Sequence, residues 1–369
     1  MKSLRNRMKT SLTISTNRSA KVGPMTMKDE KKSIRNMTEA EFREMYTLKG
    51  EVMESTNKGM SVLFATRMVD GMEVVIKVRE RSKSFTRASE EKEWCATTEV
   101  QMNMPPTDTI CQLIDVIATR HNYYVVMEKV EGKDLFEQMA DEHMQQSDVR
   151  EVVYQILDAL KVLHTQGRIH KDLKLENVMV DMNSTKEPCS PGGKGSRKSV
   201  PGSPKTKGAS PPHSPAAKLI DFDTVEAWEP DSPKARDVLG TDGYIAPEAY
   251  LGEYSPASDV YCVGVIMYKL LTHKFPSSSD IFDDGPGENF VGHPAMMRIH
   301  ERLKAEKINF AQPPLNRSPE AADLVSKMLR FDPSARPSAE EALAHTWFKM
   351  PAEELSPPAV CHADTRKSR

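Results

Sequence analysis

The spacing of apolar residues changes once along this chain, at about residue 130, and this change constrains the fold more than any other feature. Before that point apolar and polar residues alternate in short runs, as expected of half-buried strands. After it apolar residues recur every three or four positions, as in the amphipathic stretch 149–164. The expected strands are 47–53, 61–67, 72–78, 113–117 and 123–128, and the expected helices are 89–102, 149–164, 257–271, 295–305, 319–329 and 338–344. The pattern predicts an α+β fold, with a small antiparallel sheet lobe, a larger helical lobe and a cleft between them.

The composition favours a folded protein in a reducing compartment. Hydrophobic residues make up 38% of the 369 positions and charged residues 28%, which is enough apolar material for a core. The chain has no run of about 18 apolar residues, which disfavours a membrane span. Its five cysteines are scattered without paired spacing, so we expect a cytoplasmic protein.

The net charge of −2 hides two basic segments. Residues 1–35 carry ten Lys and Arg against two acids, and residues 184–218 carry seven against one. The first segment is similar in composition to an organelle import peptide, although a disordered basic tail is the simpler interpretation. The second is rich in Gly, Pro, Ser and Lys, and burial of its side chains cannot offset the entropy lost on ordering. Neither contains interleaved aromatic residues, so we expect no nucleic-acid binding.

Four short motifs occur in a fixed order in the remaining sequence. Residues 74–77 read VVIK, 170–177 read HKDLKLEN, 221–223 read DFD and 246–248 read APE. Together they resemble the signature set of the protein kinase family, over about residues 46–348. The segments VME at 126–128, DLF at 134–136 and HTWF at 345–348 are most similar to the calcium/calmodulin-dependent group. The resemblance implies a two-lobed, protein-kinase-like α+β fold and a Ser/Thr kinase that uses ATP and Mg²⁺.

The resemblance also implies roles for individual residues. Asp172 would orient the substrate hydroxyl, and Lys174 would neutralise charge on the γ-phosphate. Asn177 and Asp221 would bind Mg²⁺, a hard cation that prefers oxygen ligands. Lys77 would hold the α- and β-phosphates. The other expected nucleotide-binding residues are Val62, Met127, Asp134, Ser55, Asn57 and Glu99, of which Glu99 would orient Lys77, with Glu93 as the alternative.

Further residues would have structural roles under the same resemblance. Glu248 and Arg336 are expected to form a buried ion pair, and Asp259 to anchor the backbone of the catalytic loop. Lys171 stands where the family places an arginine that often pairs with a phosphorylated residue. We expect one of three acids in the segment after Asp221 to pair with Lys171 instead, which would make phosphorylation unnecessary for basal activity. These acids are Glu226, Glu229 and Asp231.

Besides Lys171, the chain departs from the family pattern at two places. The phosphate-covering loop falls on residues 55–62, where all three glycine positions are substituted. Because glycines let backbone amides approach phosphates closely, their loss should loosen ATP binding. The second departure is Asp223, which replaces the glycine of the DFG motif. These changes motivate an alternative hypothesis, a pseudokinase scaffold with weak or no turnover.

The expected organisation has three parts. A disordered basic tail covers 1–44, a protein kinase domain covers 45–348 and a C-terminal tail covers 349–369. Within the domain, 45–130 is the N-lobe and 131–348 the C-lobe. The C-lobe would be interrupted by a disordered insertion at 184–217, a target for an upstream proline-directed kinase because four of its serines precede proline. These serines are Ser190, Ser203, Ser210 and Ser214. The other expected partners are protein substrates.

Overall fold

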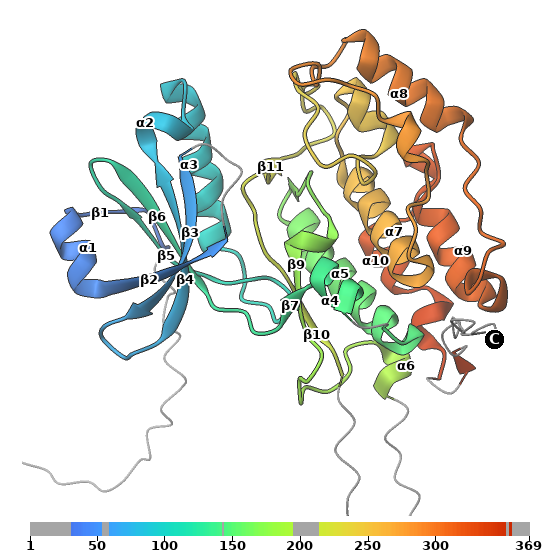
Figure 1. Cartoon of the computed structure of the whole chain (residues 1–369), viewed down its shortest axis with the longest axis horizontal. Coiled ribbons are helices and arrows are strands. Elements are labelled where there is room, and N and C mark those ends of the chain that lie inside the picture. Colours follow the sequence, from blue (N-terminus) through green and yellow to red (C-terminus); the bar gives the residue numbers. More distant parts are fainter. Residues whose placement is uncertain (1–30, 54–58, 142–143, 195–213, 352–353, 356–369) are drawn as a thin grey trace, which may run out of the picture. The chain divides into compact units, whose positions relative to one another are not determined.

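The computed structural model of the chain describes residues 31–53, 59–141, 144–194, 214–351 and 354–355. The described residues from Ser33 onward belong to one compact unit. The expected change from strands to helices near residue 130 is confirmed, because the last strand of the principal sheet along the chain ends at Glu128 and the two longest helices, Gln146–Thr165 and Pro256–Thr272, follow it (Figure 1). No helix in the described part of the chain is both long and apolar enough to cross a membrane.

The alternating N-terminal residues build a sheet that, among the described residues, has six strands in the order β1-β5-β6-β4-β3-β2. Neighbouring strands are antiparallel except for β1 and β5, which run parallel. Its strands are β1 (Arg35–Asn36), β2 (Tyr46–Met53), β3 (Met60–Arg67), β4 (Glu73–Glu80), β5 (Leu113–Ala118) and β6 (Asn122–Glu128). The register places Lys77 of β4 opposite Val62 of β3 and Val125 of β6. Lys77 therefore lies on a central strand with neighbours on both sides.

The connection between β3 and β4 follows the turn chemistry of its sequence. Gly71 has a φ of +73°, a backbone conformation that side-chain-bearing residues rarely adopt. The Arg67 N–H donates to the Met72 carbonyl at 2.8 Å and closes the hairpin. Asp70-Gly71, a dipeptide that is a strong sequence signal for a hairpin, thus lies in the turn between the two strands.

The folded domain begins earlier than the sequence pattern predicted. Strand β1 pairs with β5, and helix α1 (Glu39–Met45) follows it. Thr38 and Glu41 form a reciprocal capping box at the start of this helix. Phe42 is 1% exposed and stacks on the ring of Tyr124. Residues 35–44, predicted from the sequence as part of the basic tail, therefore belong to the sheet lobe, because the buried ring of Phe42 secures the short amphipathic helix.

One long helix packs against the N-terminal sheet, and most of the other helices follow that sheet along the chain. Helix α3 (Ala88–Met102) packs against β5, and helices α5 (Gln146–Thr165) and α7 (Pro256–Thr272) pack against each other in the largest hydrophobic cluster. The remaining helices are α2 (Arg81–Ser84), α4 (Leu135–Asp141), α6 (Pro191–Lys194), α8 (Pro294–Ala305), α9 (Pro319–Met328) and α10 (Ala339–Leu343). The long helices predicted from apolar periodicity are confirmed, with ends that differ by a few residues.

Two small sheets hold the loops that carry the sequence motifs. The strands β7 (Lys133–Asp134), β9 (Val178–Asp181) and β10 (Ala216–Leu219) form one, and β8 (Arg168–Ile169) and β11 (Glu226–Ala227) form the other. The loop between β8 and β9 contains residues 170–177, and the loop between β10 and β11 contains residues 221–223. The two motifs are thus brought together by strands that flank them on both sides.

The ends of the predicted insertion are folded, which corrects its boundaries. Glu151 on α5 accepts hydrogen bonds from the backbone N–H groups of Cys189 and Ser190, and Ser190 is fully buried. At the other end, Gln155 donates to the Pro215 carbonyl and accepts from the Ala217 N–H, both at 2.8 Å. Residues 184–194 and 214–217 therefore pack on the domain, because two polar side chains of α5 satisfy their backbone groups. The part at 195–213 lies outside the described residues.

Candidate active site

One buried carboxylate accepts hydrogen bonds from the backbone at the start of the loop 170–177. Asp259 of α7 is 1% exposed and accepts hydrogen bonds from the N–H groups of His170, at 2.8 Å, and Lys171, at 3.0 Å. Lys171 has a φ of +72°, a conformation that is costly for a residue with a side chain. The two hydrogen bonds stabilise this backbone conformation. The predicted anchoring role of Asp259 is confirmed.

The Asp172 carboxylate is surrounded by donors from two segments. The hydroxyl of Thr241 donates to Oδ1 at 2.9 Å, and Lys174 Nζ lies 3.2 Å from Oδ2. Lys174 Nζ also donates to the Thr241 hydroxyl at 3.0 Å, and the Asn177 amide donates to the Asp172 carbonyl at 2.7 Å. The side chain of Asp172 is 17% exposed, so it is oriented by its neighbours while one side remains open to solvent. Such a carboxylate can accept a hydrogen bond from an incoming hydroxyl.

Asn177 and Asp221 lie on adjacent segments, since the Ile220 N–H donates to the Asn177 carbonyl at 3.0 Å. Burial raises the pKa of the Asp221 carboxyl, but Lys77 outweighs burial by its charge and hydrogen bond, and the pKa lies below the ordinary value. The carboxylate is therefore ionised. Asp221 and Asn177 both carry side-chain oxygen atoms, the kind of ligand that Mg²⁺ prefers. Within the described ranges no group of three or more His, Cys, Asp or Glu could hold a metal ion.

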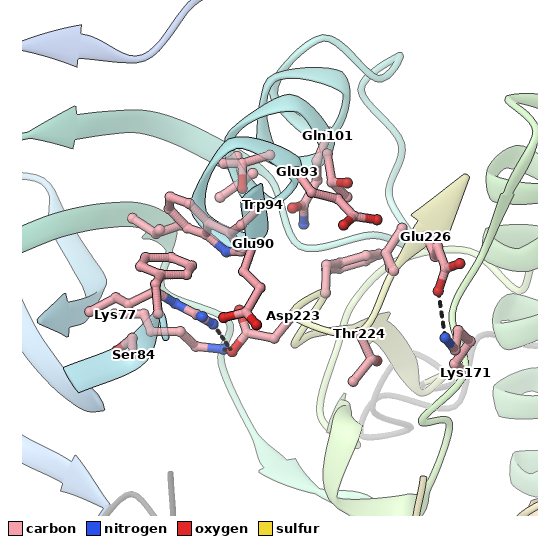
Figure 2. A pocket seen from close by; sticks show the side chains of 18 of the residues that line it. Lys77, Ser84, Glu90, Glu93, Trp94, Gln101, Lys171, Asp223, Thr224 and Glu226 are labelled. Carbon is pink, nitrogen blue, oxygen red and sulfur yellow. Dashed lines mark hydrogen bonds and ion pairs between the residues drawn. The ribbon is translucent and has the colours of Figure 1, made fainter. Parts of the chain in front are cut away.

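Lys77 faces acids that follow the β10 strand. Its Nζ lies 2.7 Å from Asp221 Oδ1 and 2.9 Å from Asp223 Oδ2 (Figure 2 shows the contact with Asp223). Burial lowers the pKa of the Lys77 ammonium, but the charges of Asp223 and Asp221 outweigh it and raise the pKa above the ordinary value. Lys77 is thus a buried, charged donor at the edge of the site.

The structure does not bring Glu99 to Lys77. The Glu99 carboxylate instead accepts a hydrogen bond from the Ile34 N–H at 3.5 Å. Helix α3 turns a stripe of residues toward the pocket beside Lys77, and Glu93 and Trp94 belong to it. Glu99 lies off this stripe, because a helix advances about 100° per residue and only positions three or four apart share a face. Glu93, the alternative, lines the pocket.

The other expected nucleotide-binding residues have these positions. Val62 is on β3, opposite Lys77, and Met127 is on β6 and lines the same pocket as Lys77. Asp134 precedes α4, and its Oδ1 accepts from the Glu137 N–H at 2.8 Å, which caps that helix. Ser55 and Asn57 lie outside the described residues.

Two predicted ion pairs are confirmed. Lys171 Nζ lies 2.5 Å from Glu226 Oε2, so Glu226 is the partner among the three candidate acids. Arg336 makes two hydrogen bonds to Glu248, at 2.7 and 2.8 Å, and both side chains are buried. The first pair links the catalytic loop to the segment after Asp221, and the second stabilises the core beneath it.

The fold and the site together define a protein kinase domain, with a lysine on a central strand and an aspartate oriented by its neighbours. The chain belongs to the protein kinase family, since the model of the protein kinase domain matches residues 58–348. The resemblance inferred from the motifs is thereby confirmed. Members of this family use ATP and Mg²⁺.

Two curated relatives belong to the group expected from the sequence. The chain is 30% identical over 298 residues to CDPK-related kinase 1 of Arabidopsis thaliana, and the aligned region covers 78% of this chain and 43% of that protein. It is 29% identical over 255 residues to the calcium/calmodulin-dependent protein kinase type II subunit delta of Oryctolagus cuniculus, which covers 67% of this chain and 39% of that protein. The chain therefore spans less than half the length of these relatives.

Proposed function

We propose that this chain is an active protein serine/threonine kinase that transfers the γ-phosphate of ATP to hydroxyl groups of protein substrates. The observation that carries the proposal is the geometry around Asp172, where Lys174 and Thr241 hold the carboxylate beside the oxygen ligands Asn177 and Asp221. Each of these residue types is needed for phosphoryl transfer, which depends on positioning and on neutralising charge.

Each residue of the site would have a distinct role in the transfer of the phosphoryl group. Asp172 accepts a hydrogen bond from the substrate hydroxyl and orients its oxygen for attack. Lys174 and Lys77 place positive charge beside the phosphates. Mg²⁺, when bound by Asn177 and Asp221, neutralises phosphate charge. The departures in the loop at residues 55–62 weaken nucleotide binding under this proposal without removing any of these groups.

The insertion supports a narrower proposal for upstream regulation. Ser190 and Ser214 are buried, with 0% and 5% exposure, so a proline-directed kinase would act on the other two serines. These are Ser203 and Ser210, which lie outside the described residues.

The test is a transfer assay with ATP, Mg²⁺ and peptides that offer only Ser, only Thr or only Tyr. Asp172→Asn should lower turnover by roughly 10² to 10⁴-fold, the range expected for a positioned general base, while ATP affinity changes little. Asp108→Asn is the matched control, because its side chain is 81% exposed and far along the chain from the motifs. Nucleotide binding without transfer by the unaltered chain would favour the pseudokinase, and transfer only to Tyr would refute the Ser/Thr assignment.

A further inference from the structure

The carboxylate of Asp223 lies between two cations of the same strand. Its Oδ2 is 2.9 Å from Lys77 Nζ and 3.3 Å from Arg79 Nη2. Lys77 and Arg79 are two positions apart on β4, so their side chains leave the same face of the sheet. The three side chains are 10%, 12% and 21% exposed for Lys77, Arg79 and Asp223, so they meet in a mostly dry environment.

Helix α3 carries four acids, and three of them bond to partners other than Lys77. The Glu90 carboxylate accepts hydrogen bonds from the backbone N–H and the hydroxyl of Thr86, just before the helix begins. Glu91 accepts from Arg81 and from the Tyr123 hydroxyl, at 2.8 and 2.9 Å. Glu99 accepts from Ile34, as described above. Glu93, the remaining acid, lines the pocket without a hydrogen bond to Lys77, so helix α3 offers the lysine no ion pair in this structure.

Arg79 occupies the space between the strand and this helix. Its guanidinium carbon lies 5.3 Å from the centre of the Phe85 ring and 5.1 Å from that of Trp94. Both distances are within the range of cation–π attraction. A positive charge held here favours a carboxylate on its open side, and Asp223 supplies it. The substitution at position 223 is thus matched by a cation on the neighbouring strand.

Asp221 is expected to bind a metal ion in addition to its contact with Lys77. The same carboxylate would then face both the metal and the Lys77 ammonium, whereas Asp223 offers Lys77 a carboxylate of its own. We propose that Asp223 is the positioning residue that orients Lys77 toward the nucleotide phosphates, in the role expected of a glutamate on α3. This inference rests on the proposed function in that it takes ATP as the ligand of the site.

The experiment compares the binding of ATP and of adenosine by calorimetry, with EDTA and again with Mg²⁺. Asp223→Asn should weaken ATP binding about tenfold, as loss of one charge-assisted hydrogen bond predicts, and leave adenosine binding unchanged because adenosine has no phosphates. A merely structural role would weaken both ligands alike. Asp223→Gly, which places the usual family residue here, tests the same point if the asparagine variant does not fold, and Asp223→Glu should restore part of the ATP affinity.

Control variants separate this inference from its alternatives. Glu99→Gln should leave ATP affinity unchanged, Glu93→Gln should weaken it less than Asp223→Asn does, and Asp231→Asn is the matched control from an exposed part of the same segment. The proposal is overturned if Asp223→Asn and Asp223→Gly bind ATP as tightly as the unaltered chain does. It is also overturned if Glu93→Gln loses more ATP affinity than these two variants. A higher turnover of Asp223→Gly would overturn it as well, because the contact of Asp223 with Lys77 would then be inhibitory. A chain that binds ATP without transferring phosphate refutes the proposed function alone, because the binding comparison still stands. A chain that binds no ATP refutes both.

Discussion

The pair of Lys171 and Glu226 should decide whether this kinase domain needs activating phosphorylation. The Lys171 side chain is 3% exposed, and its Nζ lies 2.5 Å from the Glu226 carboxylate and 4.6 Å from the centre of the Tyr254 ring. Glu226 itself stands on β11, which pairs with β8 immediately before the catalytic loop. Removing its charge leaves a buried cation without its carboxylate, directly beside Asp172.

The expected magnitude follows from the exposure of the two partners. A hydrogen bond to a charged group contributes about 1.5–3 kcal/mol, and the 48% exposure of Glu226 favours the lower end. A loss of about 1.5 kcal/mol corresponds to roughly a tenfold lower rate. Glu226→Gln, which keeps the shape of the side chain, should therefore reduce kcat/KM for a peptide substrate about tenfold.

The assay is initial-rate kinetics on protein treated with phosphatase. Glu229→Gln is the matched control, because Glu229 is an exposed acid of the same segment. Phosphatase treatment should leave activity intact, and Ser232→Ala should change it less than about threefold, or 0.7 kcal/mol. Full activity of Glu226→Gln, or a tenfold loss on phosphatase treatment or in Ser232→Ala, would refute the reasoning.

Two further predictions concern stability. Arg336→Met should lower the free energy of unfolding by about 3–5 kcal/mol, because it leaves the buried Glu248 carboxylate without its partner. Circular dichroism should then record a fall in Tm of roughly 6–20 °C, and an unchanged Tm would contradict this. Combining Glu248→Met with Arg336→Met should recover part of the lost stability. Deleting 195–213 should shift the Tm by less than about 2 °C, whereas deleting all of 184–217 should lower it more, because only the longer deletion removes the contacts of Ser190 with Glu151. Equal effects of the two deletions would show that these contacts contribute little.

Much of this protein was determined by its sequence alone. Strands, long helices and the Asp70-Gly71 turn follow from local apolar spacing and turn chemistry, which act over a few residues. The pairing of Glu248 with Arg336 was predicted from the resemblance of the ordered motifs to the protein kinase family, and the structure confirms this pair. The capping box of Thr38 and Glu41 was a local signal too, and it would have revealed helix α1.

Only the tertiary structure decided which distant side chains meet. Lys77 contacts Asp223, 146 positions away, instead of Glu99, because the rotation of α3 and the path of the chain after β10 set these distances. The choice of Glu226 over Glu229 or Asp231 depended on the pairing of β11 with β8. The ends of the insertion became ordered through Glu151 and Gln155 of α5, polar residues that give no local sign of a partner. Local sequence specifies local conformation, but a contact between remote segments depends on how whole elements pack.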